Sequence, residues 1–540
     1  MAAEGATSSL GTADAPRAPV PPSTDRGAGP PPPTQRAAGS RRIALIAFVV
    51  GASSLGSEIA AARLLAPYFG DSTLIWANTI ATVLVALSVG YWIGGRAADR
   101  DPTLRGLCRL ALGAAVLLAI VPFVAGPFLR EAVNALDAIE AGAFVGSLIA
   151  VLVLVAVPVF LLGMCSPYAV RLSVSTVGET GRVTGRLYAI STLGSLTGTF
   201  LSALVLIPFL GTRRTFLVFA LALAVAAVLG LARRAWLVPL VLAGLIVLPV
   251  GTIKAAEHGE RLLAEAETEY GYARVIERPN GDRWMELNEG QAIHSLLPAD
   301  GSYLTGDYWD EPLVLPFASV RRPPTDPPRR VAILGNAGGT TARAFGHFFP
   351  ATRVDAVEID GELTDLGHRW FDLRGRNLHT HTADARPYLR TSEGGYDLIV
   401  VDAYRQPYIP FYLTTREFFE LARDRLAPGG MVVINVGHPE DSDKLEQVLG
   451  ATLADVFAHV ARDPVQPTNT MLVASDTAIS ADALAARAAS RPAGLGPVAT
   501  QTASRLGPRI PGGRVYTDDV APVEWLIDAS IVQVAADGER

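Results

Sequence analysis

The first half of the chain consists of long apolar runs, whereas the second half alternates short apolar segments with polar turns. A helix needs about 20 mostly apolar residues to cross a bilayer. Seven runs approach this length: residues 43–66, 74–94, 107–128, 141–164, 187–210, 215–232 and 236–253. The pattern predicts an N-terminal α-helical transmembrane bundle of about seven helices over residues 43–253. The chain would then be a multi-pass protein of a cell membrane, with the lipid bilayer as a partner.

The residues before the first run predict a disordered tail. Residues 1–42 are rich in Pro, Ala and Gly and contain no apolar run, so they match neither a packed domain nor a Sec-type signal peptide. Arg41 and Arg42 beside the first run predict a cytoplasmic N-terminus. Seven spans would then put the C-terminal half outside the cytoplasm, whereas Arg213 and Arg214 in a short loop favour the opposite orientation. The side of the membrane on which the C-terminal half lies therefore stays open.

Two ionisable residues, Glu58 and Arg63, fall inside the first apolar run. Such residues at membrane depth are candidates for a transport function, and the structural alternative is that the two pair with each other or reach an interface. The net charge of the whole chain does not indicate a further partner. With a formal net charge of −6 and no basic patch, the chain is not expected to bind nucleic acid.

The C-terminal half predicts two parts. Residues 265–320 contain short alternating segments, and Asn280-Gly281 is a strong turn signal between two strands, so we expect a small β-stranded subdomain there. A Pro-rich linker follows over residues 321–328. From residue 329 to residue 540, strands and helices alternate in the manner of a parallel sheet. This region is predicted to be a doubly wound α/β domain.

A glycine-rich turn in this region predicts a nucleoside site. The strand over residues 331–334 runs directly into Gly335, Gly338 and Gly339, which precede a helix. Glycines let a ligand approach the backbone, and the helix start offers free N–H groups. The second strand ends near Glu358, about 20 residues after the turn, where an acid binds ribose hydroxyls in this fold class. No Gly-Lys-Ser/Thr follows the glycines, which argues against ATP hydrolysis.

Acids also end the next two strands. The third strand leads to Asp384 and Ala385, where an adenine ring would lie, and the fourth strand ends in Asp402 before a loop rich in Pro and Tyr. The carboxyl ends of parallel strands line the ligand crevice of a doubly wound sheet. Three acids at three successive strand ends therefore predict one site, with Asp402 as the catalytic candidate. The structural alternative is that Asp402 merely begins the loop.

No metal site is predicted. His379 and His381 form an H-x-H pair but have no third ligand of matching character nearby. Cys108 and Cys165 fall in or beside apolar runs and have no CxxC spacing.

Several of these segments together resemble the spermidine synthase (polyamine aminopropyltransferase) family. They are residues 269–313, the glycine turn, VEID at residues 357–360, the YDLIVVDAY strand and the LTTREFF segment after it. The FGDSTLIWANT segment and TDDVAPVEWL at residues 517–526 are similar to the bacterial branch that is fused to a multi-span membrane region.

The resemblance implies that residues 329–540 form an α/β Rossmann-like domain of the methyltransferase type, preceded by the small β-stranded subdomain. It also implies an aminopropyltransferase whose co-substrate is decarboxylated S-adenosylmethionine, with no tightly bound cofactor and an amine acceptor such as putrescine. By motif position, Glu358 would hold the ribose, Asp384 would contact the adenine, and Asp402 would take a proton from the attacking amine. The substrate-binding residues expected on the same basis are Tyr303, Tyr404, Arg405 and His294, although His294 could equally be a polar strand residue. A homo-oligomer is compatible with the sequence, which does not fix the number of subunits.

Two departures from the family bear on the acceptor. Gly338 stands where the family's glycine turn carries an Asp, and Arg405 stands where its catalytic loop carries a second Asp. A guanidinium beside a diammonium substrate costs about 1 to 4 kcal/mol at contact distance. Two further hypotheses therefore stay open: a nucleoside-dependent transferase with a non-polyamine acceptor, and a membrane transporter with a catalytically silent, nucleoside-sensing domain.

Overall fold

The computed structural model describes residues 33–69, 73–137, 142–248, 253–257, 259–288, 292–321, 326–404, 408–440, 442–492 and 494–527. Residues 42–540 cluster as one compact unit and residues 1–41 as another. The first helix begins at residue 33, inside the predicted disordered tail, and residues 1–32 of that tail lie outside the described residues.

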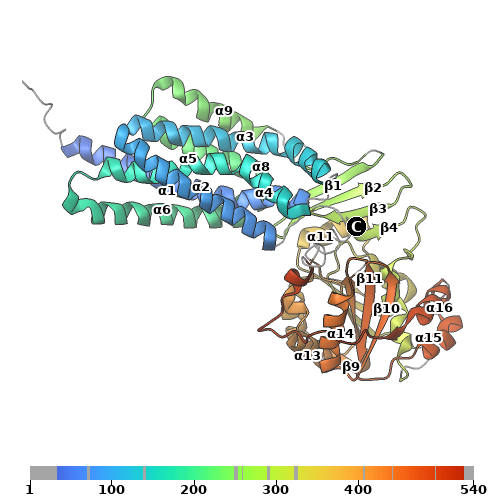
Figure 1. Ribbon diagram of the computed structural model, residues 1–540. Helices are drawn as coiled ribbons and strands as arrows, with labels where there is room; N and C mark the ends of the chain where they lie inside the picture. Colours follow the sequence, from blue (N-terminus) through green and yellow to red (C-terminus); the bar gives the residue numbers. More distant parts are fainter. Residues whose placement is uncertain are drawn as a thin grey trace, which may run out of the picture. The chain divides into compact units, whose positions relative to one another are not determined.

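Helices make up the N-terminal half (Figure 1). They are α1 (Pro33–Phe69), α2 (Thr73–Arg100), α3 (Leu104–Asp137), α4 (Gly142–Leu154), α5 (Ala156–Ser173), α6 (Thr180–Leu201), α7 (Ile207–Leu210), α8 (Thr212–Val228) and α9 (Leu237–Val247). The predicted span at residues 141–164 is divided between α4 and α5 at Val155. Within the described residues, five helical stretches are long and apolar enough to cross a membrane: Gly39–Phe69, Ile75–Arg100, Leu104–Ala132, Ala156–Ser173 and Val177–Leu210.

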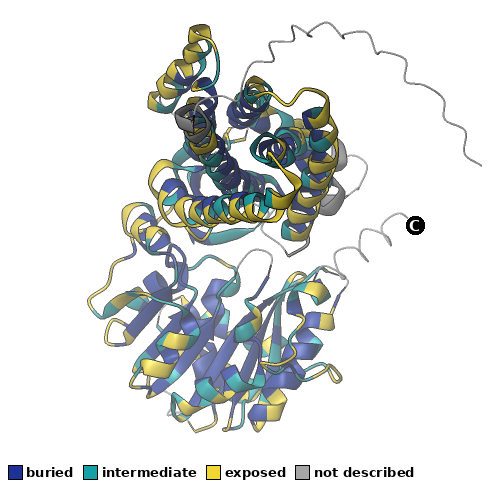
Figure 2. Cartoon of the chain, turned by 90° about the vertical axis from the view of Figure 1, so that its left-hand side faces the viewer, coloured by how far each residue is buried: buried dark blue, intermediate teal, exposed yellow. Residues whose placement is uncertain are grey.

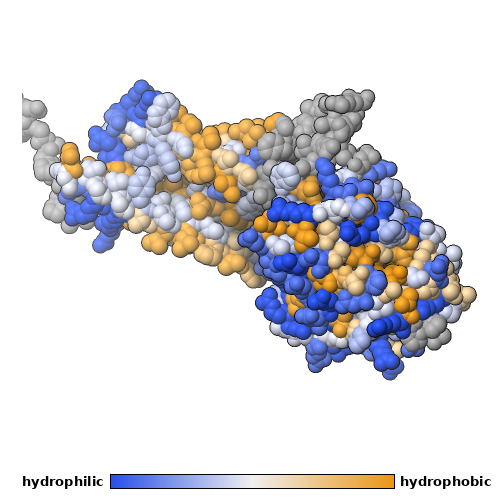
Figure 3. Space-filling view, turned by 60° about the horizontal axis from the view of Figure 1, so that its bottom comes forward, coloured by the Kyte–Doolittle hydropathy of each residue, from blue (hydrophilic) through white to orange (hydrophobic). Residues whose placement is uncertain are grey.

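Glycines let the helices of this bundle approach one another closely. A Cβ atom placed on Gly194 or Gly198 of α6 would lie 2.0 Å from the carbonyl oxygen of Phe48 or Ala52 of α1. Small residues one turn apart are the usual means of close helix contact in membranes. Large apolar residues are exposed on the bundle. Figure 2 shows the exposed positions along its helices, and Figure 3 shows hydrophobic surface over it. Examples are Leu84, Trp92, Phe123, Phe200 and Leu240.

A four-stranded antiparallel sheet follows the bundle in the chain. Its strands are β1 (Arg261–Glu267), β2 (Tyr272–Glu277), β3 (Arg283–Leu287) and β4 (Ile293–Leu297), paired in that order. Gly281 has a φ of 90° in the turn between β2 and β3, a conformation that strongly favours glycine. After β4, the 3₁₀ helix η4 (Tyr308–Leu313) leads toward the second sheet.

The second sheet has eight strands in the order β12-β10-β11-β9-β8-β5-β6-β7. The strands are β5 (Arg330–Leu334), β6 (Arg353–Glu358), β7 (Leu378–Thr382), β8 (Tyr396–Val401), β9 (Leu426–Gly437), β10 (His459–Gln466), β11 (Asn469–Ser475) and β12 (Gly507–Pro508). Strands β5 to β9 pair in parallel, whereas β10, β11 and β12 join antiparallel. The predicted Rossmann-like, methyltransferase-type fold is confirmed.

Helices cover both faces of this sheet (Figure 1). They are α10 (Thr340–Phe348), α11 (Gly361–Trp370), α12 (Ala385–Thr391), α13 (Arg416–Asp424), α14 (Lys444–Val456), α15 (Ala481–Arg487) and α16 (Leu495–Arg505). Alternate residues of β9 separate the two cores: Val432 and Ile434 pack with α13 and α14, and Met431 and Val433 pack with α15 and α16. Because residues 430–436 of β9 are buried on both sides, this part of the strand is apolar except for Asn435.

The strand order fixes where a ligand can bind. Strand β5 pairs with β6 on one side and with β8 on the other, so the chain reverses its direction of winding between β5 and β8. In open α/β sheets, ligands bind outside the carboxyl ends of the strands at such a switch point. Glu358 ends β6, and Asp402 directly follows β8.

Candidate active site

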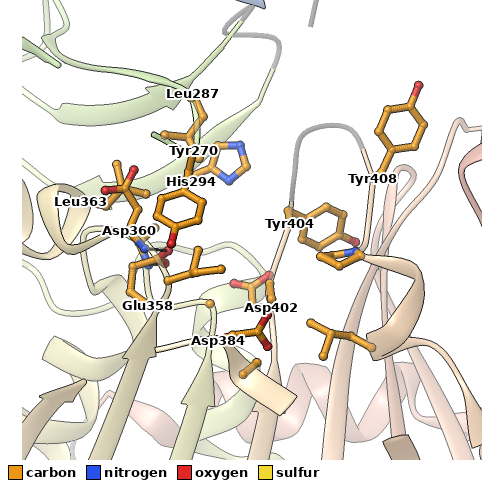
Figure 4. Close-up of a pocket in the computed structure, with 18 of the residues that line it drawn as sticks. Tyr270, Leu287, His294, Glu358, Asp360, Leu363, Asp384, Asp402, Tyr404 and Tyr408 are labelled. Atoms are coloured by element: carbon orange, nitrogen blue, oxygen red, sulfur yellow. Dashed lines mark hydrogen bonds between the residues drawn. The ribbon is translucent and has the colours of Figure 1, made fainter. Parts of the chain in front are cut away.

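A cavity of about 490 Å³ opens at this switch point. The carboxyl ends of β5, β6 and β8 line it, together with the β1–β2 turn, the loop after β8 and the C-terminal segment. Figure 4 shows Glu358, Asp384 and Asp402 pointing into the cavity from the large sheet, opposite Tyr270 and His294 from the small one. The sequence-predicted acids at three strand ends therefore come together.

Only part of the glycine turn reaches the cavity. Gly335 lines it with a φ of 89°, and a Cβ there would lie 2.4 Å from the carbonyl oxygen of Asp402, so only glycine fits. Gly338 and Gly339 are not among the lining residues. The N–H of Gly338 instead donates to Ser295 Oγ over 2.8 Å, and Gly339 precedes α10.

Glu358 is buried and holds the turn in place. Its Oε2 accepts a hydrogen bond from the N–H of Ala337 at 2.8 Å, and its Oε1 accepts one from the N–H of Asp360 at 3.1 Å. Burial raises the pKa of Glu358 above its usual value, although these backbone donors oppose that change. The remaining lone pairs of the carboxylate can accept hydrogen bonds from a ligand's hydroxyl groups.

Asp384 is the N-cap of α12 and also lines the cavity. Its Oδ1 accepts from the N–H of Arg386 at 3.0 Å, and its Oδ2 accepts from the Tyr412 hydroxyl at 2.8 Å. Ala385 lines the cavity beside it. Arg386 pairs with both carboxylate oxygens of Asp518, at 2.6 and 2.8 Å, which ties the C-terminal segment to this side of the cavity.

Asp402 lies deep in the cavity. Removal from water raises the pKa of its carboxyl to about 7, an effect that Asn435 opposes by donating a hydrogen bond and that the nearby Glu358 strengthens. Asn435 Nδ2 lies 2.8 Å from Asp402 Oδ1. A carboxyl group that titrates near neutral pH can both accept and release a proton there, which suits a general base.

Only some of the predicted substrate-binding residues line the cavity. His294 and Tyr404 line the cavity, and the Tyr404 hydroxyl donates to the carbonyl oxygen of Asn435 at 3.0 Å. Tyr303 does not line it, because its ring stacks on His347 at a centroid distance of 3.9 Å. Arg405 lies outside the described residues.

Sequence reasoning missed several residues that line the cavity. Tyr308 comes from η4, Glu269 and Tyr270 come from the β1–β2 turn, and Glu524 comes from the C-terminal segment. Asp360, two residues after Glu358, is another. The signal for most of them was present, because they lie in segments that had been singled out only as family likeness.

Charge makes the cavity selective. Among the described lining residues, six are carboxylates and none is Lys or Arg: the acids are Glu269, Glu358, Asp360, Asp384, Asp402 and Glu524. Negative charge of one sign in a cleft raises the local concentration of cations. The site therefore favours a cationic ligand.

Comparison with known proteins shows what this region is similar to. Residues 321–476 match the model of the spermine/spermidine synthase domain. A probable polyamine aminopropyl transferase of Bifidobacterium longum is 30% identical over 297 residues, covering 51% of this chain and 64% of that protein. The chain thus spans somewhat less than two thirds of that relative.

A second relative matches more of the chain. Polyamine aminopropyltransferase 1 of Ralstonia nicotianae is 26% identical over 464 residues, 81% of this chain and 83% of that protein, so the likeness extends into the N-terminal helices. Among solved structures, a probable spermidine synthase from Corynebacterium glutamicum is 23% identical, covers 48% of this chain and 97% of that one, and superposes with a TM-score of 0.38.

Proposed function

We propose that this chain, whose residues 321–476 match the spermine/spermidine synthase domain, transfers an aminopropyl group from decarboxylated S-adenosylmethionine to an amine acceptor. The observation that carries the proposal is the acid-lined cavity with Asp402 at its base. Both substrates are cations, and the described lining residues offer six carboxylates to them.

The donor would occupy the side of the cavity formed by β5, β6 and α12. Glu358 would accept hydrogen bonds from the ribose hydroxyls, since its carboxylate lies beside the turn that lets a ligand approach the backbone at Gly335. Asp384 and Ala385 would lie along the adenine ring. The Tyr412 hydroxyl fixes the orientation of Asp384 for that contact.

Asp402 would act as the general base. An amine with a pKa near 10 is mostly protonated at neutral pH, and only its neutral form can attack the carbon next to the sulfonium. Asp402 would accept the proton of the amine. The new N–C bond forms while the C–S bond breaks. The electron pair of the C–S bond stays on sulfur, which neutralises the sulfonium and gives methylthioadenosine.

The charge of the cavity favours an amine over an anionic acceptor. The hypothesis of a non-polyamine acceptor rested on Gly338 and Arg405, but the other charged groups at the site are acids. A silent sensor would also have no need of a base whose pKa lies near 7. We therefore take putrescine or a similar diamine as the acceptor, and the N-terminal bundle as the anchor in a cell membrane.

The test uses the full chain in lipid nanodiscs with decarboxylated S-adenosylmethionine and putrescine. Mass spectrometry should detect methylthioadenosine and an aminopropylated amine in equal amounts, and Asp402→Asn should lower the rate by at least 100-fold. If neither product forms with any of a panel of monoamines, diamines and triamines, the proposal is wrong.

A further inference from the structure

Three neighbouring strands bring Asp402, Asn435 and Asn469 to the same edge of the sheet. Val401 pairs with Ile434, so Asp402 lies next to Asn435 on β9. Asn435 in turn pairs with Met471 on β11. Asn469 lies two residues before Met471 and therefore shares a face of the sheet with it. Because β11 runs antiparallel, its first residue lies at the edge where β8 ends.

The hydrogen bonds among these residues all run in one direction. Thr468 Oγ1 lies 3.4 Å from Asn469 Oδ1, Asn469 Nδ2 lies 2.9 Å from Asn435 Oδ1, and Asn435 Nδ2 lies 2.8 Å from Asp402 Oδ1. An ionised carboxylate can only accept hydrogen bonds, so Asn435 must turn its NH₂ group toward Asp402. The side-chain oxygen Oδ1 of Asn435 then faces the NH₂ group of Asn469, and this hydrogen bond fixes the orientation of the Asn435 amide.

The backbone of Asn435 is held as well. The Tyr404 hydroxyl donates to its carbonyl oxygen at 3.0 Å and accepts from the N–H of Gly437 at 2.6 Å. The Asn435 side chain is 3% exposed. Because it is buried, Asn435 can present a different group to Asp402 only if its side-chain amide rotates.

We propose that Asn435, oriented by Asn469, is a positioning residue that occupies Oδ1 of Asp402 and leaves Oδ2 to receive the proton of the acceptor amine. Among the described residues, Oδ2 has no hydrogen-bond partner of its own. The inference rests on the proposed function for the identity of the proton donor. It goes beyond that function by assigning a role to two amides at strand ends that do not line the cavity.

Other groups near Asp402 also influence its titration. Glu358 on β6 opposes ionisation of Asp402, and the hydroxyl groups of Tyr308 on η4 and Tyr404 after β8 lie near it. None of these changes when Asn469 is replaced. Asn469→Leu therefore alters the orientation of the Asn435 amide without adding a charge, whereas Asn469→Asp alters it and also places a second carboxylate near Asp402.

The experiment compares the full chain with its Asn469→Asp and Asn469→Leu variants. An Asp at position 469 would draw the NH₂ group of Asn435 toward itself and turn the Asn435 carbonyl toward Asp402, which must then hold a proton. Asn469→Leu removes the group that orients the amide and adds no charge. Asn377→Asp is the matched control, because Asn377 donates only to a loop carbonyl, that of Pro350.

Two readouts separate this inference from the proposed function. The first is the melting temperature as a function of pH, with and without Asp402→Asn in each background, which reports the titration of Asp402 without any turnover. The second is the pH dependence of kcat/KM. Asn469→Asp should move both titrations upward by about one pH unit, a tenfold loss of rate below pH 7 that recovers at high pH. Asn469→Leu should move them in the same direction by less, and Asn377→Asp should move neither.

Unchanged titration of Asp402 in both position-469 variants would overturn the inference, as would an equal loss of rate at every pH. If Asn469→Asp does not fold, Asn469→Leu decides the question by the same readouts. If the wild-type chain transfers no aminopropyl group, the proposed function is wrong, and the melting curves still decide whether the amides control Asp402.

Discussion

The backbone N–H of Ala337 points at Oε2 of Glu358 over 2.8 Å, so one carboxylate joins the glycine turn after β5 to the end of β6. Ala337 has a φ of 44°, in a region that residues other than glycine rarely adopt. The acid that would bind the ribose therefore also stabilises the turn on which the nucleoside would lie. Binding and local stability should depend on it together.

We predict that Glu358→Gln weakens binding of methylthioadenosine by about 10- to 100-fold, which corresponds to about 1.4 to 2.7 kcal/mol. The glutamine NH₂ group cannot accept, so the N–H of Ala337 or of Asp360 loses its partner. The free energy of unfolding should fall by about 1 to 3 kcal/mol. Calorimetry and denaturant titration measure the two effects, and Glu362→Gln in the first turn of α11 is the control. Wild-type affinity in Glu358→Gln would exclude a ribose contact.

Asp402→Asn should be more stable than the wild type at pH 8. The pKa of Asp402 is about 7 in the folded protein against 3.8 as its ordinary value, so the folded state binds the proton more tightly. Wild-type stability then falls as pH rises from about 4 through 7, whereas the variant has no such group. The difference should be near zero at pH 4 and on the order of 1 to 3 kcal/mol above pH 7. A difference that is constant across this pH range would contradict the raised pKa.

Tyr308→Phe should raise KM for the substrates, whereas Tyr303→Phe should not. Tyr308 lines the cavity near Asp402, and Tyr303 stacks on His347 away from it. Loss of one hydroxyl contact should change KM by about 3- to 10-fold, since a hydrogen bond contributes about 0.5 to 1.5 kcal/mol. Steady-state kinetics on the two variants side by side provide the test. The reverse result would return the substrate contact to Tyr303.

Placing an Asp at position 338 and at position 405 should have unequal effects. A Cβ on Gly338 would lie 3.0 Å from Ser295 and 3.1 Å from Met285, so Gly338→Asp should destabilise the fold by about 1 to 3 kcal/mol and should not improve catalysis. Arg405→Asp should increase kcat/KM for a diamine relative to a monoamine of the same length. Competition between the two amines, followed by mass spectrometry, measures this preference. An unchanged preference would mean that position 405 does not face the acceptor.

Much of the site could be predicted because its residues belong to single local patterns. Glu358 ends β6, whereas Asp384 and Asp402 follow β7 and β8. The carboxyl ends of parallel strands meet at one edge of the sheet, whatever the conformation of the loops. The glycine turn was recognisable for the same reason. The sequence could not show that Gly338 faces Ser295 rather than the ligand, since that depends on where β4 lies.

The other residues of the site could not be predicted, because they reach the cavity through contacts between segments that are distant in the sequence. Glu269 and Tyr308 reach the cavity from outside the Rossmann-like domain, and Glu524 reaches it because Arg386 binds Asp518. None of these contacts follows from local periodicity. In the N-terminal half, hydrophobicity alone did not reveal the division of residues 141–164 at Val155, because the run is apolar on both sides of that position. The sign of it is Pro158, which cannot donate a hydrogen bond to the carbonyl four residues before it.

Transfer of a labelled aminopropyl group tests the central claim most directly. Decarboxylated S-adenosylmethionine with ¹³C in its propyl chain is incubated with the full chain in nanodiscs and unlabelled putrescine. The account predicts that the labelled carbons appear in the amine product, one group per methylthioadenosine released, and that Asp402→Asn abolishes the transfer. The account would be contradicted if the chain binds methylthioadenosine, and loses that binding in Glu358→Gln, but forms no labelled product. The C-terminal domain would then bind a nucleoside without transferring an aminopropyl group.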